Sequence, residues 1–174
     1  MSIKHAFESA KDDGADATLV RPSNWNAEHT ITTSKIRAQP NATQSIPTAT
    51  HTKVTLANEI FDTLGEFDPA TNYRFTAINP GYYLVIGAIR YEASLVVDKR
   101  YFCAIHKNGI GNIVAIAAQT LSVAAAIVVS CSGIINLAAG DYIELGAYHD
   151  AGQDVTINAA GAYEQTYLCV ARIL

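Results

Sequence analysis

From residue 31 onward, apolar and polar residues alternate in short runs along the chain. Successive side chains of a β-strand point to opposite faces, so a period of two indicates strands. No segment combines a helical period with capping residues. The pattern predicts strands over residues 35–39, 52–56, 74–77, 82–91, 101–106, 113–118, 126–131, 142–148, 155–158 and 163–173.

Turn-forming residues separate these runs. They are Asp68-Pro69, Asn79-Pro80-Gly81, Asn108-Gly109 and Ala139-Gly140-Asp141. Asn-Gly between two apolar runs is a strong hairpin signal. Many short strands at this spacing predict an all-β sandwich or jelly roll.

The predicted strand over residues 82–91 is mostly apolar on both faces. One face carries Tyr83, Val85, Gly87, Ile89 and Tyr91. The other carries Tyr82, Leu84, Ile86, Ala88 and Arg90. A surface strand of an antiparallel sheet normally exposes one polar face to water. We therefore expect the second face to be covered, either by other subunits or by residues 1–30 folded back.

Composition points in the same direction. The chain has 174 residues, enough for one domain with a substantial core. Charged residues make up only 16%, against about 25% in a typical soluble protein. So few charges predict an oligomer. The net charge of −4 and the lack of a Lys/Arg run argue against a nucleic-acid partner or an anionic membrane surface.

The N-terminal segment has a different character. Residues 1–30 are polar and irregular, with no apolar core of a secretory signal. We expect synthesis and folding in a reducing cytoplasm. The three cysteines, Cys103, Cys131 and Cys169, lack the spacing of metal ligands, and their odd number leaves at least one unpaired within the chain. They are interpreted as buried free thiols.

Residues 108–140 contain no charged side chain, and their length and hydropathy are those of a candidate membrane-spanning segment. Gln119, Thr120 and Ser122 interrupt the apolar run, and no basic residues flank it. We expect no membrane insertion, and instead two or three strands buried in a sheet or a subunit interface.

No motif predicts an enzyme or a cofactor. The five histidines are His5, His29, His51, His106 and His149, and no two are spaced as metal ligands. His106 is interpreted as a strand-end residue; on a threefold axis it could meet its copies and bind an ion. Asp98, Asp141, Asp150 and Asp154 are interpreted as solvated turn residues, with a glycosidase pair or a calcium site as alternatives.

Three motifs occur in an order that resembles a known family. They are FDPATNYRFTAINPGYYLV (residues 67–85), KRYFCAIHKNG (99–109) and LAAGDYIELGAY (137–148). They resemble the globular head domain of complement C1q and its tumour-necrosis-factor-like (TNF-like) relatives. The resemblance spans roughly residues 34–174.

The resemblance implies a jelly roll that assembles as a compact homotrimer, with the second face of strand 82–91 packed against sibling subunits. It implies that the trimer interface and core include Phe75, Tyr82, Tyr83, Leu84, Val85, Ile86, Val128, Leu145 and Tyr167. The small-residue run at 123–129 suits close packing of sheets.

The segment HAFESAKDDGADATLVRPSNWNAEHTI (residues 5–31) resembles a module at the start of bacteriophage structural proteins. Residues 1–32 are therefore predicted to attach a trimeric knob, residues 33–174, to the virion. Phe7, Arg21 and Trp25 are the expected attachment residues. Trp25 folded back on its own sandwich is the alternative.

The knob is predicted to bind a host receptor or glycan through exposed loops, because loops on a rigid sandwich commonly carry specificity. The candidate residues are Lys99, Arg100, His149, Asp150 and Gln153. Ordinary solubilising loops are the alternative for each. The alternative function is a capsid decoration or head fibre with a structural role. A glycan-cleaving depolymerase is disfavoured, because 174 residues are too few for an extended catalytic trimer.

Overall fold

A computed structural model describes residues 2–3, 12, 14–15, 29–30, 33–158 and 166–173. The chain divides into two units, Met1–Thr33 and Ser34–Leu174. In the first unit, strands β1 (Ser2–Ile3) and β2 (His29–Thr30) pair antiparallel, with Ser2 opposite Thr30. All regular structure among the described residues is β-strand.

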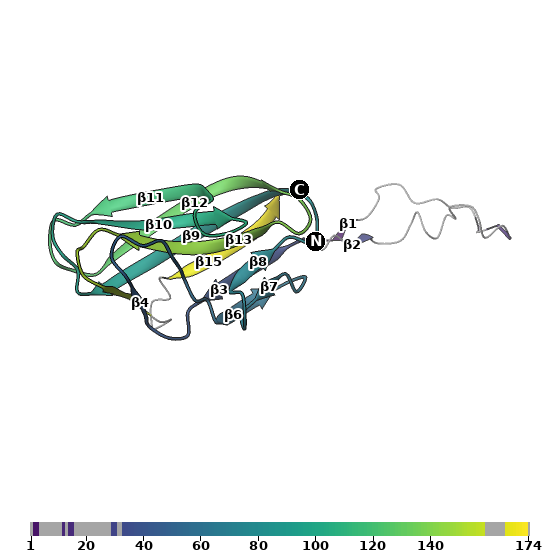
Figure 1. Cartoon of the computed structure of the whole chain (residues 1–174). Coiled ribbons are helices and arrows are strands. Elements are labelled where there is room, and N and C mark those ends of the chain that lie inside the picture. The colour runs from purple at the N-terminus through teal and green to yellow at the C-terminus, as the bar shows by residue number, and fades with distance from the viewer. Residues whose placement is uncertain are drawn as a thin grey trace. The chain divides into compact units, whose positions relative to one another are not determined.

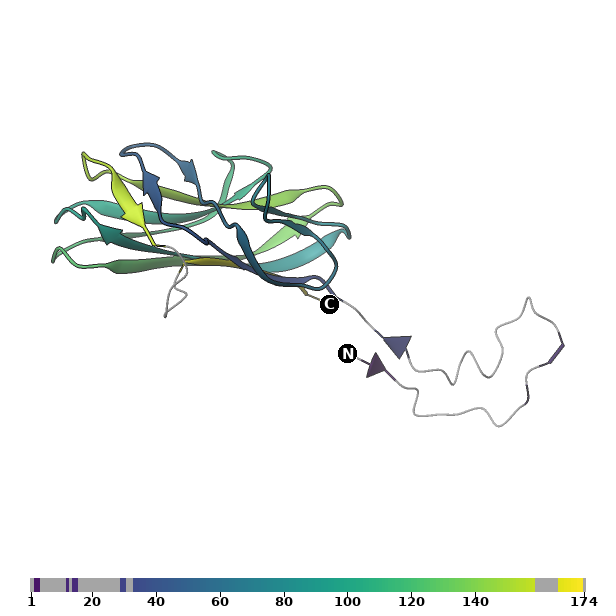
Figure 2. The same ribbon diagram turned by 90° about the horizontal axis from the view of Figure 1, so that it is seen from below.

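The second unit consists of two antiparallel sheets stacked as layers (Figures 1 and 2). The six-stranded sheet contains β5 (Thr52–Lys53), β7 (Phe67–Asp68), β8 (Arg74–Thr76), β10 (Arg100–Lys107), β11 (Ile113–Thr120) and β13 (Tyr142–His149). The seven-stranded sheet contains β3 (Lys35–Gln39), β4 (Gln44–Ile46), β6 (Asn58–Asp62), β9 (Gly81–Ala93), β12 (Ile127–Leu137), β14 (Val155–Ile157) and β15 (Tyr167–Ile173). This arrangement confirms the predicted all-β jelly-roll sandwich.

Every predicted strand overlaps an observed one, whereas three observed strands of the second unit, and both strands of the first, were not predicted. The three in the second unit are β4, β6 and β7. They are short and rich in polar residues (QSI, NEIFD and FD). Their extended conformation depends on hydrogen bonds to β14, β3 and β8 rather than on a local pattern.

Strand β9 is the centre of the seven-stranded sheet. It pairs with β12 along one side over its first eleven residues, and with β15 along the other. Tyr83, Val85, Ile89 and Tyr91 point inward and are fully buried. The period-two pattern of the sequence therefore correctly identified the core face of this strand.

Aromatic rings from both sheets fill the interior. Phe75 packs against Tyr83 with ring centroids 5.5 Å apart, and Tyr91 packs against Tyr101 at 5.2 Å. The Tyr91 hydroxyl donates a hydrogen bond to the Phe102 carbonyl at 2.6 Å. Large buried rings dominate the energetics of such a core, and a hydrogen bond at each buried hydroxyl avoids the cost of desolvating it.

The uncharged segment 108–140 forms two strands, β11 and β12, joined by a link that is exposed after the buried Leu121. Within that link, Val123 is 69% exposed, so it does not pack inside the sandwich of one protomer. In the part of the chain that the structure describes, no helix is long and apolar enough to cross a membrane.

Candidate interaction surface

The outer face of the seven-stranded sheet is apolar over its central strands. Register places Leu84 beside Ile134 of β12 and Ala171 of β15, and places Tyr82 beside Ile173. Tyr82 is 60% exposed and Ile134 is 66% exposed. The second apolar face of β9 is therefore uncovered within the described protomer.

This surface is hollowed rather than flat. A depression of about 180 Å³ is lined by Lys35, Ile36, Phe61, Leu84, Ile86, Cys169, Val170 and Ala171. Arg37 lies at its border, with its guanidinium 4.5 Å from the centre of the Tyr167 ring. We call Phe61, Tyr82, Leu84, Ile134 and Ile173 the apolar face; each is more than a third exposed.

A second apolar surface lies where the two sheets end side by side. β11 is the last strand of the six-stranded sheet, and β12 is an edge strand of the other. The two strands pack against each other. The exposed apolar side chains of β11, named here the apolar edge, are Ile113, Val114 and Ile116.

The residues predicted for the trimer interface and core divide between two places. Phe75, Tyr83, Val85 and Leu145 are fully buried inside the sandwich, so they belong to the core of one protomer. Those on the outer face are Tyr82, Leu84, Ile86, Val128 and Tyr167. Within β9, the alternation of side chains separates Tyr82, Leu84 and Ile86 from Tyr83 and Val85.

Phe61, Ile134 and Ile173 of the apolar face were not identified from the sequence. For Ile134 a signal existed, because Ser130, Ser132 and Ile134 alternate with the buried Val129 and Cys131. For Phe61 no local signal existed. It lies in a strand whose five residues are all at least partly exposed, so only its pairing with Arg37 places it on this face.

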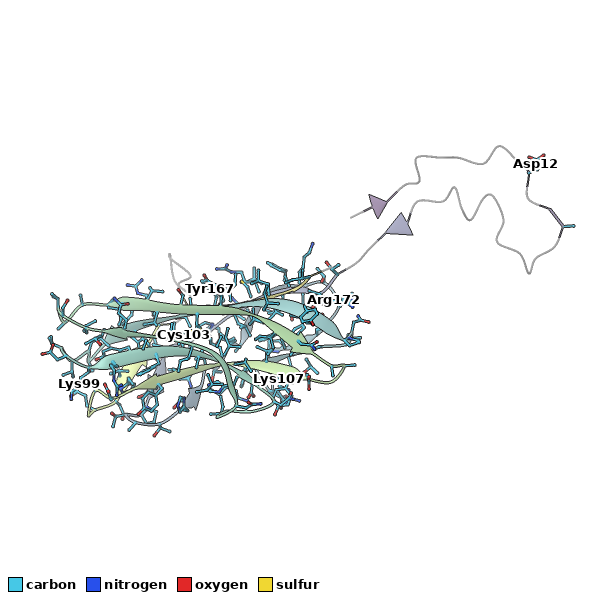
Figure 3. All side chains as sticks on the ribbon, turned by 90° about the horizontal axis from the view of Figure 1, so that it is seen from above. Asp12, Lys99, Cys103, Lys107, Tyr167 and Arg172 are labelled. Carbon is cyan, nitrogen blue, oxygen red and sulfur yellow. The ribbon has the colours of Figure 1, made fainter. Side chains whose placement is uncertain are left out.

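Four of the predicted receptor-facing residues gather at one end of the sandwich. The Arg100 guanidinium contacts the Asp150 carboxylate at 2.8 Å, and that carboxylate also accepts from the Arg100 backbone N–H at 2.7 Å. Gln153 is exposed, and its side-chain amide donates to the Ser94 carbonyl at 2.9 Å. Lys99 precedes β10 at the same end, opposite Lys107 (Figure 3).

His149 does not join this group, and its prediction as an exposed loop residue is wrong. The ring is fully buried, and Nε2 lies 2.8 Å from the Ile46 carbonyl. Nδ1 accepts from the Ala151 N–H at 3.3 Å. Strand β13 extends one residue further than predicted, and this extension places the His149 ring in the interior, next to Ile46 of β4.

The predicted attachment residues Phe7, Arg21 and Trp25 lie outside the described residues.

A cluster of polar side chains that was not predicted from the sequence lies on the outer face of the six-stranded sheet. His106 is fully buried and pairs across strands with Glu144, whose carboxylate contacts the Lys53 ammonium at 3.0 Å. The His51 ring meets the His106 ring edge-on at 5.8 Å and stacks on Tyr148 at 4.7 Å. Cross-strand register, which the sequence does not show, brings these residues together.

Burial and the neighbouring His51 lower the pKa of His106, and Glu144 opposes the shift. His106 Nδ1 accepts from the Gly111 N–H at 3.1 Å, which favours the neutral ring. Among residues 33–158 and 166–173, no group of three or more His, Cys, Asp or Glu side chains has metal-binding geometry.

The predicted turn residue Asp141 organises two turns. Its carboxylate contacts the Lys107 ammonium at 2.7 Å and accepts from Asn108 at 2.8 Å and from the Ala138 N–H at 2.8 Å. These bonds lower the pKa of Asp141 to about 2. The carboxylate therefore fastens the β10–β11 turn to the one before β13.

Comparisons with known proteins identify the fold. No protein-family model matches the chain, and no curated protein matches its sequence. Among solved structures, murine APRIL at pH 5.0 superposes with a TM-score of 0.63 at 13% identity, covering 82% of this chain and 100% of that chain. The globular domain of zebrafish complement 1qA gives 0.57 at 17% identity, covering 81% and 98%. Eiger TNF from S. frugiperda gives 0.58 at 14%, covering 82% and 93%. The domain has the TNF/C1q-like fold that the motifs implied.

Proposed function

We propose that the protein is a non-enzymatic, homotrimeric binding domain of a bacteriophage virion. In this proposal the TNF/C1q-like sandwich is the knob, residues 1–32 hold it to the particle, and the knob binds a host-surface receptor or glycan. The observation that carries the trimer is the uncovered apolar face of the seven-stranded sheet.

Exposed apolar patches of this kind mark interaction surfaces, because monomers rarely leave a large contiguous one in water. Here the centre is formed by Tyr82, Leu84 and Ile134, with Lys35, Arg90 and Glu92 nearer its border. An apolar centre with a polar rim is the usual anatomy of a stable interface.

The apolar face and the apolar edge are different surfaces of one protomer. A contact that joins two different surfaces is heterologous, and repeated contacts of this type close into a ring when the rotation permits. An edge placed on the face of the next copy would cover both surfaces in every subunit. The family resemblance of residues 34–174 supplies the number three.

The virion assignment is supported by the resemblance of residues 5–31 to a phage module and by the division of the chain after Thr33. The group around Arg100, Asp150 and Gln153 supports binding at one end of the sandwich, because it combines exposed charge with a backbone held by Asp150. A capsid decoration with a purely structural role is the second candidate, since a stable trimer with an anchor would serve it equally.

Native mass by light scattering tests the trimer. We expect a mass near three times 18.6 kDa that persists on dilution. Leu84→Glu and Ile134→Glu place a charge in the apolar face and should lower the mass. Val97→Glu, at an exposed position in the loop before β10, is the matched control and should leave it unchanged. A wild-type protein that is monomeric at every concentration would refute the assembly.

Binding assays separate the two candidate functions. For a receptor binder, the purified full chain should adsorb to host cells and compete with infecting phage. Arg100→Ala with Gln153→Ala should weaken that competition without changing the native mass. For a decoration protein, the chain should bind particles that lack it and leave adsorption unaffected. In both cases Trp25→Ala should reduce incorporation into particles.

A further inference from the structure

Two of the three thiols lie next to each other in the core. Cys103 belongs to β10 of the six-stranded sheet, Cys131 to β12 of the seven-stranded sheet. Their sulfur atoms are 3.5 Å apart, and both residues are buried and reduced. Figure 3 shows Cys103 between Lys99 and Lys107, the residues that mark the two ends of β10. The pair therefore bridges the two layers of the sandwich.

Small side chains allow the layers to approach at this point. Cys131 pairs with Gly87 of β9, and Cys103 pairs with Ala117 of β11. A Cβ atom at Gly87 would stand 3.4 Å from the Cys103 sulfur and 2.6 Å from the Leu145 side chain. A disulfide bond is about 2.0 Å long, so the sulfur atoms must approach by about 1.5 Å. Rotation of two cysteine side chains and a small shift of an edge strand can supply this movement.

The two thiols are not equivalent. Cys131 is 8% exposed, whereas Cys103 has no exposed surface. Cys131 also lies in β12, which pairs with β9 along its length. The hydrogen bond between the thiols lowers the pKa of Cys131. The same hydrogen bond, together with burial, raises the pKa of Cys103 well above its usual range. Since the thiolate is the nucleophile in exchange reactions, Cys131 is the thiol that reacts first.

We propose that Cys103 and Cys131 form a redox-active pair, which a low-molecular-weight disulfide converts into a disulfide bond between the two sheets. In the first step the Cys131 thiolate attacks one sulfur of the reagent, forms a mixed disulfide and releases one reagent thiolate. In the second step Cys103 gives its proton to that thiolate and attacks the Cys131 sulfur, which displaces the second reagent thiolate; this thiolate takes up the proton that Cys131 lost to solvent before the first step. Two protein thiols are oxidised, and one reagent disulfide is reduced to two thiols.

The bond would link the two layers after folding is complete. The step at which this disulfide would form in the life of the protein rests on the proposed function, since a virion protein folds in a reducing cytoplasm and meets an oxidising medium after release. The chemistry itself does not depend on that function. Cross-linking residues that are 28 positions apart restricts the unfolded chain and thereby stabilises the fold.

The test uses the reduced, native full chain incubated with 2-hydroxyethyl disulfide. Free thiols are counted by alkylation, and the linkage is located by peptide mapping without reduction. We expect the count to fall from three to one, with Cys103 joined to Cys131 and the intact mass lower by two hydrogen atoms. Tm should rise by about 5–10 °C, and reduction should reverse the rise.

Matched variants separate this pair from Cys169. In Cys169→Ala the disulfide and the rise in Tm should remain. Cys103→Ala should instead hold the reagent on Cys131 as a stable mixed disulfide, because the resolving thiol is missing. Cys131→Ala should form no internal bond. Circular dichroism verifies that each variant is folded. If Cys103→Ala or Cys131→Ala does not fold, the thiol count of the folded Cys169→Ala protein decides whether the internal disulfide forms.

Three results for the internal pair would overturn the proposal, and one result for Cys169 would do the same. They are an unchanged thiol count in the native protein, a wild-type mixed disulfide that does not resolve, and a bond that forms only in denaturant. Cross-linking of subunits through Cys169 in place of the internal bond would also contradict it. None of these outcomes bears on the native mass or on particle binding, so failure here is distinct from failure of the proposed function.

Discussion

Tyr82 and Tyr83 are neighbours in β9, yet they lie on opposite sides of the sheet. Tyr83 is fully buried, and its hydroxyl donates to the Asn79 carbonyl at 2.6 Å, whereas Tyr82 is 60% exposed on the apolar face. Two identical side chains one position apart therefore have different roles. Tyr83 contributes to the stability of one protomer, and Tyr82 is available to a neighbouring copy.

This difference predicts separable effects of substitution. Tyr82→Lys should keep the β-sheet circular dichroism and a cooperative transition while the native mass falls, because the charge enters the proposed interface. Tyr83→Ala should lower the free energy of unfolding by about 3–5 kcal/mol, as expected for loss of a buried aromatic ring. Light scattering and urea unfolding measure the two effects. If Tyr82→Lys left the trimer intact, the apolar face would not be the interface.

Gly146 is predicted to be intolerant of a side chain. The His106 ring lies over it so closely that a Cβ at Gly146 would overlap the ring. Gly146→Ala should lower the free energy of unfolding by about 1–3 kcal/mol, because the ring is buried and cannot move aside freely. Gly133→Ala is the matched control, since its Cβ would stand at an ordinary 3.6 Å from Ala115. Equal stability of the two variants would contradict this packing.

The Tyr91 hydroxyl is predicted to stabilise the pairing of β10 with β13. It donates to the Phe102 carbonyl at 2.6 Å and lies 3.2 Å from the Tyr148 carbonyl. Burial raises the pKa of Tyr91 far above its ordinary range, so the hydroxyl keeps its proton. Tyr91→Phe should cost about 1–3 kcal/mol in urea unfolding. Tyr142→Phe keeps the ring beneath Arg74 and should cost less.

His106 is predicted to make stability depend on pH. Its pKa in the folded protein is lowered from the usual 6.5, so the unfolded chain binds the proton more tightly. The stability that the neutral ring contributes is present above pH 6.5 and is lost as pH falls through the lower, folded value. Urea unfolding between pH 8 and pH 4 should show this loss, and it should be smaller in His106→Gln.

A variant of His51 checks the cause of the shift. Because the His51 ring also lowers the pKa of His106, His51→Gln should raise it, whereas Glu144→Gln should lower it further. Titration of the His106 ring by NMR measures both. A folded pKa at or above the usual histidine value in the wild-type protein would contradict the burial argument.

Period-two alternation in the sequence was sufficient to predict the fold class and most strands. It identified the inward face of β9, because the alternation of side chains is a local property of an extended chain. It failed for β4, β6 and β7, whose few polar residues are extended only through their partners.

The sequence by itself determined that the chain forms an all-β sandwich, that β9 is apolar on both faces, and that its three cysteines lack the spacing of metal ligands. Only the tertiary structure decided which residues meet across strands and layers. It placed Cys131 3.5 Å from Cys103, His106 over Gly146, and the His149 ring in the interior. The physical reason is that strand register and the distance between sheets result from packing of the whole core, and no short segment encodes them.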